Sequence, residues 1–123
     1  MKIELHQAKA ERIERSLAKC TARDYETVIE AAMLAGTHRF NVLLHRAGLR
    51  DVDNDVVHAE FVSLGERRKL SVALPDALNA LDEIERLRTT HVRGDMPDGE
   101  RAAGFALECL ARLRDPAARR ISQ

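Results

Sequence analysis

The chain has 123 residues, of which 45% are hydrophobic and 33% charged, so it can bury one core and is too apolar for intrinsic disorder. The 20 Lys and Arg residues balance the 20 Asp and Glu residues, so the chain has no net positive charge that would attract nucleic acid or an anionic membrane. Any anion site must therefore be local, and the excess of Arg over Lys (16 against four) favours bidentate phosphate contacts there.

Aromatic residues make up only 3% of the chain, and its commonest residues, Ala and Leu, are strong helix formers. The charged start of the sequence has no apolar signal-peptide region, and no apolar run approaches the roughly 18 residues that span a bilayer. The two cysteines, Cys20 and Cys109, match no metal or redox spacing and fall in helical apolar stripes. We therefore expect one all-α cytoplasmic domain over residues 1–123, without membrane contact and with both thiols buried and free.

The first third of the chain predicts two long helices. From Ile3 to Cys20, apolar or small side chains, together with His6, recur at the three- and four-residue spacing of an amphipathic helix. Thr21 and Asp24 then form a capping-box pattern, which predicts the start of a second helix. The apolar stripe of this helix continues until Gly48, a residue suited to a left-handed helix end.

The middle of the chain predicts a third, shorter helix. The polar segment from Arg50 to Asp55 is typical of a loop, with Asp55 as the N-cap of that helix. One side of the helix would carry Val57, Phe61, Leu64 and Arg68. Gly65 would weaken its middle, and Pro75, which suits the first turn of a new helix, indicates a break near residues 71–74.

The last third predicts two more helices. The fourth helix turns its aliphatic side chains inward, namely Leu74, Leu78, Leu81, Ile84 and Leu87. A turn-rich stretch from Gly94 to Gly99 ends it, and Asp95 is the expected N-cap of a final helix that runs to about Arg114. The whole pattern predicts an up-and-down four-helix bundle with an additional short helix.

Five histidines are present, and their spacing argues against a metal site. His38 and His45 lie two helical turns apart on one face, but no carboxylate precedes either at the E-x-x-H spacing of di-iron bundles. A metal-binding bundle would need carboxylates that converge on these two residues from elsewhere. We therefore expect no metal and no cofactor, and we interpret His6 and His58 as partly buried, hydrogen-bonded histidines of the core.

The sequence also lacks a P-loop, a dinucleotide-binding glycine pattern and a nucleophile elbow, but one stretch concentrates groups that could hold a phosphate. Arg86 and His91 are the candidate catalytic residues, because a guanidinium can neutralise phosphate oxygens and an imidazole can transfer a proton near neutral pH. The candidate phosphate-binding residues are Arg88, Thr89, Thr90 and Arg93. Such a site needs no metal.

The two candidate catalytic residues can share a ligand only if their helix is interrupted. On an unbroken α-helix their side chains would point about 140° apart. Thr89 and Thr90 are β-branched and weaken the helix between them. We therefore predict a helix end or kink between Leu87 and Val92 that turns His91 toward Arg86.

Arg86 and His91, with four residues between them, resemble the Arg-x4–6-His motif of the HEPN family of small helical bundles. Other parts of the chain look similar to the helices of this family. The second helix of the family resembles the stretch with Asp24-Tyr25-Glu26, Ala31-Ala32, Leu43-Leu44 and Gly48. Its third helix resembles the stretch with His58 and Phe61, and its last helix resembles residues 102–113. The resemblance implies a HEPN-like homodimer that binds RNA or nucleotide. It also implies metal-independent RNA cleavage, in which His91 assists attack by the 2′-hydroxyl and Arg86 stabilises the developing charge, and a nucleotidyltransferase partner of the toxin–antitoxin kind.

One alternative belongs to a different functional class. The chain would then be a non-catalytic protein–protein interaction or substrate-binding helical bundle. The scarcity of aromatic residues favours this alternative, because few side chains can stack on bases. In that case Arg86 would pair with Asp82, and His91 would cap the last carbonyls of the fourth helix.

Overall fold

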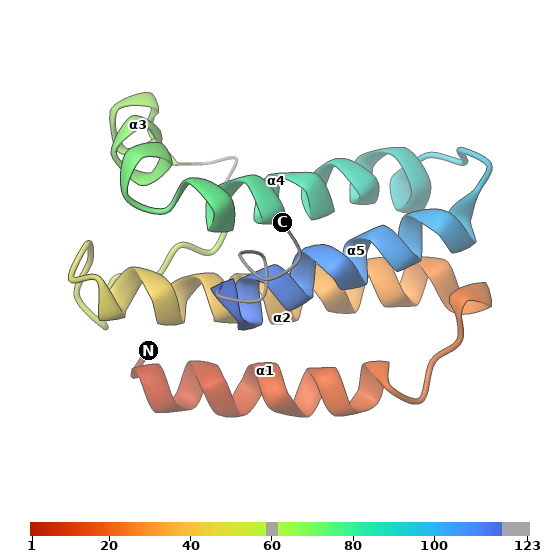
Figure 1. Ribbon diagram of the computed structural model, residues 1–123, viewed down its shortest axis with the longest axis horizontal. Helices are drawn as coiled ribbons and strands as arrows, with labels where there is room; N and C mark the ends of the chain where they lie inside the picture. Colours follow the sequence, from red (N-terminus) through yellow and green to blue (C-terminus); the bar gives the residue numbers. More distant parts are fainter. Residues whose placement is uncertain (59–61, 117–123) are drawn as a thin grey trace.

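The computed structural model describes residues 1–58 and 62–116. Helices account for 76% of the described residues, among which no strand occurs. Four long helices alternate in direction, and a shorter helix lies at one end of the molecule (Figure 1). They are α1 (Ile3–Leu17), α2 (Tyr25–Arg46), α4 (Pro75–Leu87) and α5 (Gly99–Arg114), with α3 (Leu64–Ala73) as the short helix. The predicted helical bundle with an extra short helix is thus confirmed.

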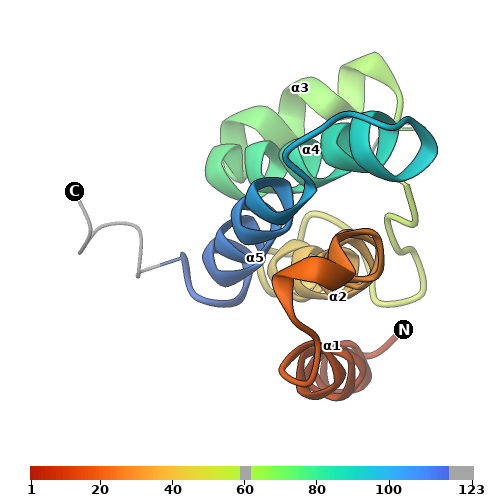
Figure 2. The same ribbon diagram turned by 90° about the vertical axis from the view of Figure 1, so that its right-hand side faces the viewer.

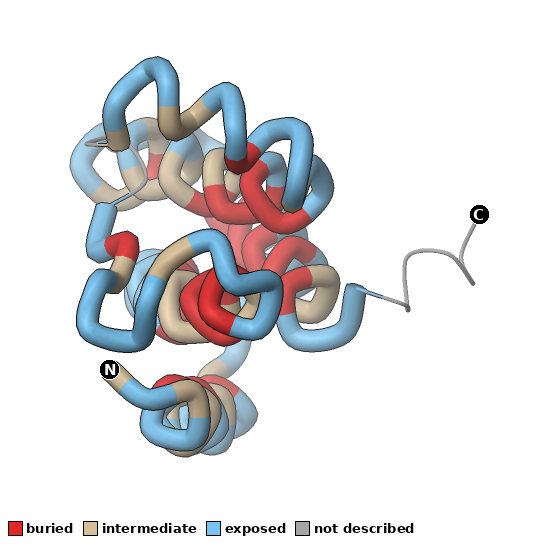
Figure 3. The backbone as a smooth tube through the Cα atoms, turned by 90° about the vertical axis from the view of Figure 1, so that its left-hand side faces the viewer, coloured by how far each residue is buried: buried red, intermediate tan, exposed pale blue. Residues whose placement is uncertain are grey.

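Helix α2 is the centre of the molecule. It packs against α1 on one side and against α4 and α5 on the other (Figure 2). The buried backbone is concentrated where α2, α4 and α5 meet, whereas most of α1 is exposed or half-buried (Figure 3). The largest fully buried side chains include Ile29, Phe40, Leu44, Leu81, Ile84 and Leu113. Helix α1 packs chiefly on α2, on the side away from α4 (Figure 2).

The ends of α2 follow the sequence signals. Thr21 and Asp24 form a capping box at the short 3-10 helix η1 (Ala22–Asp24), which leads directly into α2. At the other end Gly48 adopts a φ of 69°, the left-handed conformation that glycine tolerates best. The next N–H, that of Leu49, donates to the Leu44 carbonyl at 3.1 Å and closes the last turn.

The third helix begins later than predicted. Its N-cap is Ser63, whose hydroxyl accepts a hydrogen bond from the Glu66 N–H at 3.2 Å, so the prediction of Asp55 as the N-cap is wrong. Val57 and His58 lie in the preceding loop and are exposed, contrary to their predicted places in a helix and in the core. Phe61 lies outside the described residues. The predicted break before α4 is confirmed, since Pro75 is the first residue of that helix.

Helix α4 ends at Leu87 and continues as a π-helical turn, η3 (Arg88–Arg93). The hydroxyls of Thr89 and Thr90 donate to carbonyls one turn back, at 3.3 and 3.1 Å. The Gly94 N–H then bonds the Thr89 carbonyl at 3.0 Å, an i to i−5 bond. The α-helix thus ends where an end or kink was predicted, but helical backbone continues to Arg93. Helix α5 has Asp98 rather than Asp95 as its N-cap. None of the described helices is long and apolar enough to cross a membrane.

Candidate functional site

In the structure, the side chains of the two candidate catalytic residues contact different partners. The Arg86 side chain is 63% exposed and forms an ion pair with Glu83, not with Asp82. The His91 ring is buried: Nδ1 lies 2.6 Å from the Thr90 hydroxyl, and Nε2 lies 2.9 Å from Oδ1 of Asp98. Among the described residues, no hydrogen bond or ion pair joins the Arg86 side chain to His91 or to a partner of its ring. Only the backbone carbonyl of Arg86 bonds to a shared group, the Thr90 hydroxyl, at 3.1 Å.

The candidate phosphate-binding residues already have partners. The Arg88 guanidinium donates to Glu30 at 3.0 Å and to Glu85 at 2.7 Å. The hydrogen bond to Glu30 is the main reason that the pKa of Arg88 is raised. Arg93 lies 3.7 Å from the same Glu85, and the hydroxyls of Thr89 and Thr90 bond to the backbone. Two carboxylates therefore neutralise the arginines of this region.

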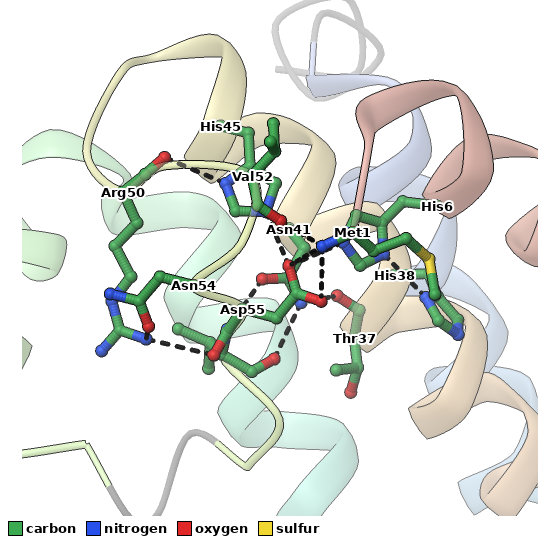
Figure 4. Close-up of polar contacts among 11 residues, drawn as sticks. Met1, His6, Thr37, His38, Asn41, His45, Arg50, Val52, Asn54 and Asp55 are labelled. Atoms are coloured by element: carbon green, nitrogen blue, oxygen red, sulfur yellow. Dashed lines mark hydrogen bonds and ion pairs between the residues drawn. The ribbon is translucent and has the colours of Figure 1, made fainter.

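A second cluster of titratable groups lies at the opposite end of α2, and four residues form it: His6, His38, His45 and Asp55. Both His6 and His45 direct Nε2 at the same carboxylate oxygen, Oδ1 of Asp55, at 2.9 and 2.8 Å (Figure 4). Nδ1 of His6 lies 2.9 Å from Nδ1 of His38. We call this set the histidine cluster.

Three separate segments supply the histidine cluster. His38 and His45 are seven residues apart on α2, and His6 projects from the first turns of α1. Asp55 comes from the loop between α2 and α3. The buried Asn41 side chain fixes this loop, because its carbonyl accepts the Val56 N–H at 2.8 Å and its amide donates to the Val56 carbonyl at 2.7 Å.

A second anchor holds the loop from the other side. The Arg50 guanidinium donates to the backbone carbonyl of Asp55 at 3.2 Å and forms an ion pair with Glu66 of α3. The carbonyl of Arg50 in turn accepts a hydrogen bond from Nδ1 of His45 at 3.0 Å. The backbone on both sides of the carboxylate is therefore held in place.

Burial and charge act together in the cluster. The His6 and His45 side chains are 2% and 0% exposed, and that of Asp55 is 24% exposed. Burial alone would raise the pKa of Asp55, but hydrogen bonds from His45, His6 and the amino group of Met1 outweigh it and lower this pKa to about 2. Asp55 is therefore a carboxylate at neutral pH. Burial, and secondly the nearby His6, lower the pKa of His38.

A groove of about 780 Å³ runs along α2 from the histidine cluster toward η3. Its α2 residues lie on one face of the helix, at three- and four-residue spacing from Thr27 to Asn41. The middle of the groove is apolar and is formed by Ala31, Met33, Leu34, Val56 and Val57. One end carries His6, His38 and Asp55, and the other carries Glu26, Glu30 and Arg88.

Sequence reasoning found part of this site. It predicted that His6 is a buried, hydrogen-bonded histidine, which is confirmed. It also named a condition for a metal site, carboxylates converging on His38 and His45, and the structure meets this condition only for His45. Asp55 bonds to His45 and to His6, while His38 joins the cluster through His6.

The signals that could have identified the site were the shared face of His38 and His45 and the aspartate in the following loop. Local spacing could not show that this loop folds back onto α1. No protein-family model, curated protein or solved structure matches the chain.

Proposed function

We propose that this chain is a non-catalytic, substrate-binding helical bundle, whose ligand is a small molecule with an elongated apolar body and a carboxylate head group. The observation that carries this proposal is the groove along α2. Its volume of about 780 Å³ suits a small-molecule site, and its middle is apolar with polar groups at the two ends. Two apolar side chains of its wall, Leu34 and Val57, are 54% and 66% exposed, so a ligand would cover surface that is otherwise in contact with water.

The different polar groups at the two ends of the groove orient the ligand. The end near η3 carries two glutamates, Glu26 and Glu30, and one arginine that bonds to Glu30. The other end carries imidazoles, and the charge of Asp55 there is already compensated by hydrogen bonds from His6 and His45. An anionic head group therefore fits the histidine end. Along α2 the groove spans about 22 Å from residue 26 to residue 41, at about 1.5 Å per residue.

The HEPN-like ribonuclease interpretation has weaker support from the geometry. It would use Arg86 and His91, whose side chains share no partner among the described residues, and a neighbouring arginine, Arg88, that two glutamates already neutralise. Its RNA or nucleotide ligand, homodimer and nucleotidyltransferase partner stay predictions from the resemblance alone.

The test is calorimetric titration of the purified chain with sodium dodecanoate, below its micelle concentration, and with dodecylamine as a charge-reversed probe. We expect saturable binding of one dodecanoate per chain and weaker binding of the amine. Leu34→Glu should weaken dodecanoate binding at least about tenfold, because it places a charge in the apolar wall.

The matched control is Leu5→Glu, since Leu5 is 53% exposed and does not line the groove. It should leave the affinity unchanged. Equal affinity for the amine and the carboxylate, or equal losses in the two variants, would contradict the proposal.

A further inference from the structure

We propose that His6, His45 and Asp55 form a binding site for a divalent transition-metal ion of the zinc class. The atoms that would coordinate the ion are Nε2 of both histidines and a carboxylate oxygen of Asp55, and these atoms all lie within 4.8 Å of one another. This inference stands independently of the proposed groove ligand, because the ion needs no organic molecule to bind.

The hydrogen-bond partners of His45 carry the argument. Nδ1 faces the Arg50 carbonyl at 3.0 Å, and a carbonyl can only accept, so Nδ1 carries a hydrogen. Nε2 faces Oδ1 of Asp55 at 2.8 Å, on a side chain that is 0% exposed. In this tautomer Nε2 presents its lone pair toward the carboxylate, and a metal ion held between the two groups would bind that lone pair and the carboxylate oxygen together.

His6 has the same arrangement. Its Nε2 faces Oδ1 of Asp55 at 2.9 Å, and its Nδ1 faces Nδ1 of His38 at 2.9 Å. If Nε2 of His6 binds the ion, its Nδ1–H donates to His38. Each coordinating histidine then has an acceptor for its other nitrogen, as in most protein metal sites, where this second contact fixes the tautomer and the ring orientation.

The two nitrogen–oxygen distances require only a small adjustment. Two ligand atoms at about 2.1 Å from a tetrahedral zinc ion lie about 3.4 Å apart. The two Nε2–Oδ1 separations, 2.9 and 2.8 Å, would therefore open by about half an ångström. Asp55 is half-buried, so a short shift of its side chain is sufficient. Two imidazoles with one carboxylate suit zinc and its first-row neighbours and disfavour magnesium, which prefers oxygen ligands.

The experiment is calorimetric titration of the tag-free, chelator-treated full-length chain with zinc chloride alone and, separately, with magnesium chloride alone. We expect one zinc ion per chain and no magnesium binding. Asp55→Asn should weaken zinc binding more than about 100-fold, beyond the usual effect of losing an outer contact. His38→Gln removes only the partner of His6 and should weaken binding about 10- to 100-fold.

The matched control is Asp53→Asn, the same substitution at an exposed position of the same loop, which should leave zinc binding unchanged. Circular dichroism of each variant checks that the helices are kept, and Leu34→Glu, designed for the groove, should bind zinc normally. The inference is overturned if the unaltered chain binds no zinc, if it binds magnesium equally well, or if zinc binding survives both Asp55→Asn and His38→Gln.

Discussion

Replacing Asn41 with leucine tests whether one buried amide holds the loop that completes the site. Asn41 is 1% exposed, and Val56, whose N–H and carbonyl both bond to it, is 2% exposed. Asn41→Leu keeps the side-chain volume similar but leaves these two backbone groups without their partner. A buried unsatisfied polar group costs about 1–3 kcal/mol, so two of them cost about 2–6 kcal/mol. The buried leucine recovers about 1–2 kcal/mol, so the expected net loss of stability is about 2.5 kcal/mol, the difference between the midpoints of the two ranges.

For a chain of this length, such a loss lowers the melting temperature by on the order of 10 °C. The measurement is urea unfolding followed by circular dichroism, with Asn79→Leu as the control because Asn79 is exposed on α4. The control should change stability by less than about 0.5 kcal/mol. The reasoning is refuted if the two variants have the same stability. It is also refuted if Asn41→Leu binds zinc and dodecanoate as the unaltered chain does, because the loop would then be held by other contacts.

Three further predictions concern other parts of the molecule. The hydrogen bond from Arg50 lowers the pKa of Glu66, so Glu66→Gln should reduce the free energy of urea unfolding above pH 4.5, and the difference should disappear as the pH falls through the lowered pKa. Burial raises the pKa of the Cys109 thiol, so a thiol reagent at pH 8 should modify it only on unfolding; rapid labelling of the native chain would contradict its buried position. The ribonuclease hypothesis requires that Arg86→Ala and His91→Gln each abolish any RNA cleavage by the purified chain, and cleavage that persists in either variant would exclude it.

The helices were predictable because their signals are local. The amphipathic spacing of α1, the capping box at Thr21 and the glycine at position 48 each act within a few residues. The same is true of Pro75, which marks the start of α4. In each case the side chain or backbone that stabilises the element is a sequence neighbour, so the pattern in the sequence contains the physical cause.

The loop before α3 was not predictable in this way. Val57 has the apolar character and spacing of a helical residue, and Asp55 is a good N-cap type, yet contacts with distant residues decide their conformation. Asp55 meets His6, which is 49 residues away, and the following residue bonds to Asn41 on α2. These tertiary contacts override the local helix signal, and they cannot be predicted from the spacing of neighbouring residues.

The site and the packing of α1 are parts of one structure. Helix α1 lies chiefly against α2, and its polar contacts with the rest of the described chain include the histidine cluster and the ion pairs of Glu14 with Arg39 and Arg114. An ion held by His6, His45 and Asp55 would join α1, α2 and the loop at a single point. By mass action it would add about 2.7 kcal/mol to the stability of the folded chain at 100 times its dissociation constant. The ion would stabilise α1 and the loop, which contribute few side chains to the apolar core. Metal binding would therefore strengthen the packing of α1 against α2.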